Sequence, residues 1–83
     1  MDNRVALIGI IAGEPAVAED INAILHEYRQ YIIGRMGLPY REKNISIISV
    51  IVDAPNNIIS SISGKLGMLE GVNAKAIYSN VKG

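Results

Sequence analysis

The sequence contains one pattern twice. The run Val5–Pro15 aligns with Ile45–Pro55, and both runs are apolar, rich in β-branched residues and end at a proline. Each run precedes a stretch with helical spacing, and the same alignment places Ile32–Leu38 on Val72–Tyr78. A strand–helix–strand unit repeated once uses nearly all of the 83 residues. The repeat therefore predicts one small domain, residues 1–83, with no room for a separate catalytic or DNA-reading domain.

The spacing of apolar residues predicts the order β-α-β-β-α-β. Short apolar runs predict strands, and apolar residues three or four apart predict helices. The strands are expected at Val5–Ile11, Tyr31–Leu38, Ile45–Val52 and Val72–Ser79. The helical stripes are expected at Val17, Ile21, Ile24, Leu25 and Tyr28, and at Ile58, Ile62, Leu66 and Leu69. This order is the ferredoxin-like arrangement, an α+β fold with a four-stranded antiparallel sheet and both helices on one face.

The two strands expected at the centre of the sheet are apolar on both faces. A sheet that helices cover on one side normally alternates apolar and polar residues, and monomers rarely expose a large apolar patch. We therefore predict a homo-oligomer, either a dimer or a tetramer. Its interface is expected to include Leu7, Ile45, Ile47 and Ile51. The alternative is that β-branched residues were selected there only for strand propensity.

Composition restricts the function. The formal net charge is zero, so no broad basic field attracts nucleic acid or an anionic membrane. The chain has no cysteine, and its single histidine, His26, could join a metal site only with ligands pooled across subunits. No apolar run approaches the roughly 20 residues of a membrane span, and the N-terminus lacks a signal-peptide pattern. We expect a cytoplasmic protein.

No catalytic constellation is evident. Ser63-Gly64-Lys65 resembles part of a phosphate-binding loop, but it lies within an expected helix and lacks the strand and glycine spacing of that motif. Asp53 and Glu70 are single carboxylates at turns, without the context of a general acid and base. We expect no enzymatic activity, no cofactor and no metal.

The second strand carries two candidate ligand-binding residues, Arg35 and Gly37. Arg35 and Lys75 occupy matching positions of the repeat and the same parity of the pleat, so they could form an anion-attracting pair beside the oligomer face. Alternatively, both are edge-strand charges that prevent aggregation. Gly37 could let the backbone approach a ligand or another subunit, or it could simply permit a bend.

The first turn and helix, Gly13–Val17 continuing to Ile21 and Leu25, resemble the opening of ACT domains. These small regulatory modules bind amino acids or similar ligands between subunits. The resemblance implies ligand contacts at Gly13, Glu14 and Ala16. In ACT domains a Pro-Gly step receives the ligand, whereas here Ala16 replaces that glycine.

A closer resemblance covers Ile24–Ala54 and Ser63–Ser79, with His26-Glu27-Tyr28 and Ile33–Gly37 as distinctive segments. These segments are similar to short ACT-like proteins described as regulators of the iron-only hydrogenase system. That family implies a βαββαβ fold related to the C-terminal domain of nickel-responsive repressors. It also implies a role in hydrogenase production or maturation in anaerobic bacteria. The cysteine and multiple histidines that a nickel site would use are absent.

The leading hypothesis is a non-catalytic, oligomeric regulatory module. Its expected partners are other copies of itself, a small-molecule effector bound between subunits near Gly13–Ala16 or Arg35, and a protein of the hydrogenase system. A direct nucleic-acid-binding regulator, an accessory enzyme with a shared active site and a structural adaptor remain alternatives. The repeat copies diverge most in His26–Gly37, where we expect the functional residues.

Overall fold

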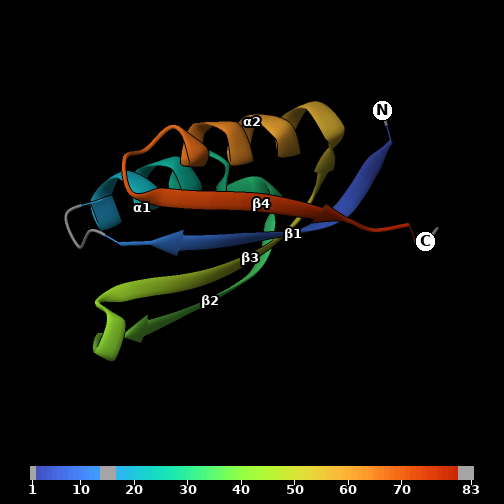
Figure 1. Cartoon of the computed structure of the whole chain (residues 1–83). Helices are drawn as coiled ribbons and strands as arrows, with labels where there is room; N and C mark the ends of the chain where they lie inside the picture. The colour runs from blue at the N-terminus through green and yellow to red at the C-terminus, as the bar shows by residue number, and fades with distance from the viewer. Residues whose placement is uncertain (1, 14–16, 81–83) are drawn as a thin grey trace.

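The computed structural model describes residues 2–13 and 17–80, and it confirms the expected βαββαβ order (Figure 1). The elements are β1 (Asn3–Ala12), α1 (Ala18–Glu27), β2 (Ile32–Tyr40), β3 (Ile45–Pro55), α2 (Asn56–Gly67) and β4 (Val72–Tyr78). Two 3₁₀ turns, η2 (Arg29–Tyr31) and η3 (Arg41–Lys43), flank β2. The antiparallel sheet has the strand order β2-β3-β1-β4, and both helices lie on one face (Figure 1).

The core lies between the helices and one face of the two central strands. Alternate residues of β1 and β3 point into it, which places Ile8 and Val50 at 0% exposure. The apolar stripe of α1 is anchored by Ile21 and Leu25 as the spacing predicts. The buried residues of α2 are Ile59, Ile62 and Leu66. Ile58 and Leu69, which were expected in the stripe, instead pack at its margin.

Three strands are longer than expected. β1 begins at Asn3 and ends at Ala12, beyond both ends of the expected Val5–Ile11. The expected second strand ended at Leu38, but β2 runs to Tyr40 because Pro39 and Tyr40 pair with Ser46 and Ile45. An edge strand accepts a proline, since one side of it makes no ladder hydrogen bond. β3 likewise continues to Pro55, which pairs with Asn3 at the start of β1.

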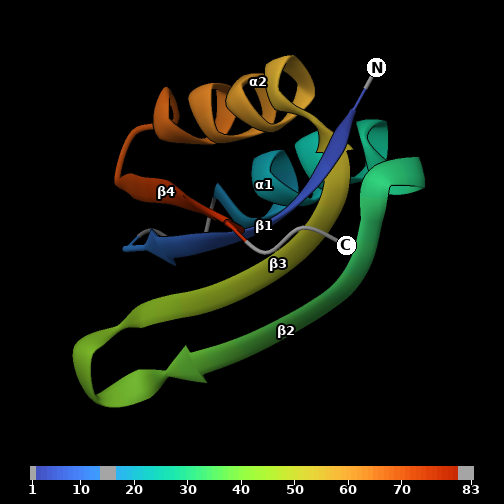
Figure 2. The same cartoon turned by 90° about the vertical axis from the view of Figure 1, so that its right-hand side faces the viewer.

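The β2–β3 hairpin extends beyond the helical layer. Figure 2 shows the hairpin swinging away from both helices, and the residues from Met36 to Tyr40 are exposed. The accessible surface is 5748 Å², compared with the roughly 4,900 Å² typical of a folded monomer of this mass. The monomer therefore exposes more surface than its size requires.

A β-bulge at Ile33 divides β2. Ile32 pairs with Val52, but Gly34 pairs with the next residue, Ile51, so Ile33 is the extra residue. The bulge reverses the parity of every later residue in the strand. Arg35 consequently pairs with Val50 and lies on the helix side of the sheet.

The expectation that Arg35 and Lys75 flank the same face is therefore wrong. Lys75 pairs with Gly9 of β1 and lies on the open face, opposite the helices. The equivalent outer strand, β4, pairs with β1 in unbroken register. One inserted residue in β2 thus separates two positions that the sequence repeat had aligned.

Candidate functional site

The open face of the sheet carries most of the exposed large apolar side chains among the described residues. Its exposed members come from all four strands: Val5, Leu7, Ile11, Met36, Leu38, Tyr40, Ile47, Ile51 and Ile77. Leu7 and Ile51 are cross-strand partners, and Ile47 and Ile45 follow along the same side of β3. The four residues predicted for the interface therefore lie together on one surface. Monomeric proteins seldom leave such a surface in contact with water.

Gly9 lies at the centre of the open face. It pairs with Ser49 on one side and with Lys75 on the other, so the middle of this apolar surface has small or polar side chains. A Cβ atom added to Gly9 would meet nothing within 4 Å, and Gly9 does not have a positive φ. Glycine inside a strand destabilises it by roughly 0.5–1 kcal/mol relative to alanine. Neither backbone geometry nor space within the described residues requires this glycine.

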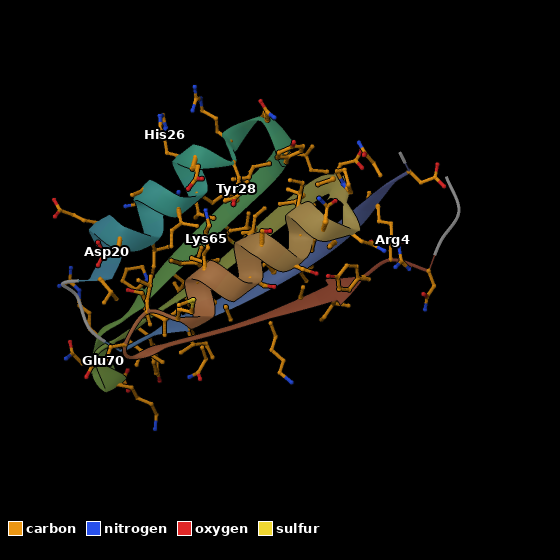
Figure 3. The ribbon with its side chains drawn as sticks, turned by 90° about the horizontal axis from the view of Figure 1, so that it is seen from above. Arg4, Asp20, His26, Tyr28, Lys65 and Glu70 are labelled. Atoms are coloured by element: carbon orange, nitrogen blue, oxygen red, sulfur yellow. The ribbon has the colours of Figure 1, made fainter. Side chains whose placement is uncertain are left out.

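The second candidate region is an open groove between α1 and β2, on the opposite side of the sheet. The groove has a volume of about 710 Å³ and is lined by Glu19, Asn22, Ala23, Leu25, His26, Arg29, Ile32 and Arg35. His26 lies on the side of α1 turned away from α2 (Figure 3). Half of the lining residues come from the divergent segment His26–Gly37, where the sequence analysis expected function.

The polar groups of the groove are held in place by local hydrogen bonds. The Arg29 guanidinium donates to the backbone carbonyl of His26 at 3.0 Å, and the Arg35 guanidinium donates to Oδ1 of Asn22. Both acceptors are neutral. Within residues 2–13 and 17–80 the ion pair joins Lys65 to Glu27, so no described carboxylate neutralises Arg29 or Arg35.

A smaller pocket adjoins the groove and shares Arg35 with it. This pocket has a volume of about 90 Å³ and is lined by Ala12, Ala18, Ile21, Asn22, Arg35, Ser46 and Ile48. Ala12 and Ala18 flank the connection between β1 and α1. The structure thus places Arg35 beside the end of β1 and the start of α1.

The other predicted ligand residues are less well supported. The backbone N–H of Gly13 donates to the carbonyl of Gly71 at 2.9 Å, so this donor is already used within the fold. Glu14 and Ala16 lie outside the described residues. Gly37 pairs with Ile48 and shares the helix side of β2 with Arg35, but it does not line either pocket.

The space between the helices holds a separate polar contact. Lys65 of α2 donates to Oε2 of Glu27 at 3.1 Å, and its Nζ lies 5.1 Å from the centre of the Tyr28 ring (Figure 3). Interactions with Tyr28 and then with Glu27 raise the pKa of Lys65 above its ordinary value of 10.5. This contact joins the two helices at their exposed surface.

Among the described residues, no three His, Cys, Asp or Glu side chains are grouped so that they could hold a metal ion. None of the described helices has the length and apolar character needed to cross a membrane.

The sequence did not single out Arg29 or Asn22. Arg29 follows the end of α1 and looks like an ordinary solvated cation, while Asn22 lies on the polar side of that helix. Their proximity to Arg35 depends on the packing of α1 against β2 and on the bulge at Ile33. The available signal was the i, i+4 spacing of Asn22 and His26, which places both on one face of α1.

Comparison with known structures supports the fold. The uncharacterized protein TM1266 from Thermotoga maritima matches with a TM-score of 0.89 and 31% identity, over 93% of this chain and 98% of that chain. A formyltetrahydrofolate deformylase from Pseudomonas putida KT2440 matches 94% of this chain with a TM-score of 0.68. Its identity is only 13% and the match covers 30% of that chain, so this likeness concerns the fold alone.

Sequence comparison agrees with the closer structural match. No curated protein matches the chain. The TM1266-like family model, described as "Iron-only hydrogenase system regulator, putative", matches residues 4–76. These residues include all four strands except the ends of β1 and β4, both helices and the whole groove. The chain belongs to the TM1266-like family.

Proposed function

We propose that this protein is a non-catalytic regulatory module of the iron-only hydrogenase system and that it works as a homo-oligomer joined through the open face of its sheet. The description of its family supports the regulatory role. The observation that carries the assembly is the apolar character of the open face. An effector would bind in the groove between α1 and β2, on the other side of the sheet from the subunit interface.

The open face suits a second copy of the chain. An isologous interface brings the same patch of two subunits together, so the patch must be compatible with itself. Here the register places one anion, Asp53, and one cation, Lys75, at different positions of a surface that is otherwise uncharged. The chain has a formal net charge of zero, so two copies approach without long-range repulsion.

Gly9 explains how two such faces could approach closely. Its missing side chain and the short side chain of Ser49 leave a gap in the middle of the surface, while Leu7 and Ile11 stand on either side along β1. The side chains of a facing subunit could fill that gap. The monomer does not need the glycine, so a requirement imposed from outside the monomer accounts for it.

Sedimentation velocity can test the assembly with two matched variants. Gly9 and Gly37 both lie in strands and both have open space at Cβ, but they lie on opposite faces of the sheet. We expect the wild-type protein to sediment as a dimer or larger oligomer at tens of micromolar. Gly9→Lys should sediment as a monomer, because it fills the central gap and buries a second, like-charged ammonium beside Lys75. Gly37→Lys should assemble as the wild type does.

Circular dichroism on the same samples separates assembly from folding. Both variants should retain the wild-type far-ultraviolet spectrum. A wild-type protein that stays monomeric at these concentrations would contradict the proposal. Equal loss of assembly in the two variants would also contradict it, because the face of the sheet would then make no difference.

A further inference from the structure

We infer that the groove between α1 and β2 binds a small anionic metabolite, one that carries phosphate or carboxylate groups on a compact body. This inference rests on the proposed effector-binding role and gives the effector a chemical class. The shape of the groove, the donors along it and the lack of a described counter-ion for its arginines support the assignment.

The dimensions of the groove suit a small molecule. Its volume of about 710 Å³ falls within the roughly 300–1,000 Å³ of typical ligand sites. Ala23, Leu25 and Ile32 provide an apolar wall, while the remaining lining residues are polar or charged. A mixed lining of this kind can pack against the body of a ligand and orient its charged groups.

The polar side of the groove consists mainly of hydrogen-bond donors. Asn22 and His26 are one turn apart on the same face of α1, about 6 Å along its axis. Arg35 is anchored at the level of Asn22, and Arg29 at the level of His26. Because Oδ1 of Asn22 already accepts from Arg35, its amide N–H₂ group can donate to a ligand. Two guanidinium groups therefore lie about one helical turn apart, with further donors between them.

The charge of these arginines is available to a ligand. A guanidinium has five N–H donors in a planar fork that matches the oxygens of carboxylate or phosphate. The structure gives Arg29 and Arg35 one hydrogen bond each in the groove, and both bonds go to neutral acceptors. A ligand anion can therefore use the remaining donors without displacing an ion pair among the described residues.

Glu19 is the acidic residue of the groove, and its position leaves the end of the groove beside Arg29 positive. It lies seven residues before His26, which corresponds to about 10 Å along the helix axis, but only three residues before Asn22, where Arg35 is anchored. One carboxylate facing two guanidinium groups leaves an excess of positive charge. The strongest contact with the negatively charged groups of a ligand is therefore expected at Arg29, at the end of the groove farther from Glu19.

Titration calorimetry with pyrophosphate and with citrate tests this assignment and separates phosphate from carboxylate recognition. We expect saturable binding of at least one of them to the wild-type protein. Arg29→Gln and Arg35→Gln should each weaken that binding by about tenfold or more, because each removes a charge-assisted contact. Arg29→Lys should bind better than Arg29→Gln, because it retains the positive charge but not the planar fork.

Arg41→Gln is the matched control. Arg41 is an exposed arginine in η3, at the tip of the hairpin, and does not line the groove. This variant has the same change in net charge and should bind the anion as the wild type does. If Arg41→Gln weakens anion binding as much as the groove variants do, overall charge accounts for the effect and the proposed site is wrong. Absence of saturable binding of both anions at millimolar concentration would also overturn it.

A short DNA duplex provides the remaining comparison. If the duplex binds more tightly than either small anion in the same salt, and depends on Arg29 and Arg35, the groove recognises nucleic acid and the small-molecule assignment is wrong. The failures of the two proposals are distinguishable. A monomeric wild-type protein in sedimentation contradicts the proposed assembly, whereas an absence of anion binding in calorimetry contradicts only the effector class.

Discussion

Both faces of the sheet carry large apolar side chains along β1 and β3, but the two faces have different surroundings. Ile8 and Leu7 are neighbours on β1, yet Ile8 is fully buried beneath the helices while Leu7 is 39% exposed. The two helices supply the cover for one face, and none of the described residues covers the other. The difference shows that apolar residues on a strand indicate a face that is buried in the functional state. They do not indicate whether the same chain or a second subunit buries it.

The largest expected effect is a loss of stability, and it should differ between neighbouring residues of β1 that lie on opposite faces. Ile8→Ala should lower the free energy of unfolding by about 2–5 kcal/mol, because it opens a cavity in a closed core. The loss should be present at every protein concentration. Leu7→Ala should have a smaller effect on the monomer, with a loss that grows at concentrations where the wild type assembles. Urea unfolding at several concentrations measures both.

Two outcomes would contradict this comparison of the two faces. If Leu7→Ala costs as much as Ile8→Ala at concentrations where the protein is monomeric, then Leu7 is part of a monomer core and the open face is not open. If the free energy of unfolding is independent of protein concentration for both the wild type and Leu7→Ala, the open face contributes nothing to assembly.

Two glycines outside both faces should give stability changes of intermediate size. Gly71 has a φ of 78°, a left-handed conformation that costs a residue with a Cβ about 1–2 kcal/mol. Gly71→Ala should therefore lower stability by about that amount, independently of protein concentration. Gly64 lies in α2 with open space at its Cβ, so Gly64→Ala should raise stability by up to about 1 kcal/mol.

Thermal unfolding at two concentrations measures both glycine variants. A concentration-dependent loss for Gly71→Ala would mean that the turn before β4 takes part in assembly. Gly71→Ala could then not serve as an assembly-independent reference for the variants on the two faces.

The smallest effect is expected on the outer surface of the helices, where the contact is between charged groups. Lys65→Met should change the unfolding midpoint only slightly at pH 7, because exposed ion pairs contribute little. The folded pKa of Lys65 is raised, so its contribution is fully present below pH 10.5 and is lost as the pH rises through the higher folded value. The difference between wild type and variant should therefore disappear at strongly alkaline pH.

Chemical unfolding at neutral and strongly alkaline pH checks this last prediction. Lys43→Met, which alters a lysine in η3 away from both helices, controls for the general effect of losing a positive charge. If the two lysine variants behave identically at both pH values, the contact between Lys65 and Glu27 adds nothing to the stability of the helical layer.

Most of the fold could be predicted from the sequence because the apolar runs of β1 and β3 are recognisable without knowing their partners in the sheet. Val50 and Ile51 alternate within one strand, so the two apolar faces could be assigned before their cover was known. The fold order, and the placement of the four predicted interface residues on one face, followed from this. The longer strands did not follow, because Pro39 and Pro55 belong to strands through pairing with Ser46 and Asn3.

The groove was less accessible to sequence reasoning because it depends on register. Arg35 could be recognised as a candidate, but its face depended on whether Ile33 was paired or bulged. From the sequence, His26 was an isolated histidine. It lies in one groove with Arg29 and Asn22 because of the way α1, η2 and β2 are arranged. A position in a repeat indicates an equivalent strand, but not an equivalent direction of the side chain.

The bulge at Ile33 has a consequence at the level of the gene. Because Ile33 has no partner in β3, deletion of its codon would leave Gly34 opposite Ile51 and Arg35 opposite Val50, so both surfaces of β2 would keep their residues. Deletion of one codon after Gly34 would instead move every later residue of β2 to the other face of the sheet. The length of β2 can therefore change at the bulge without altering either surface, whereas the same change further along the strand exchanges them.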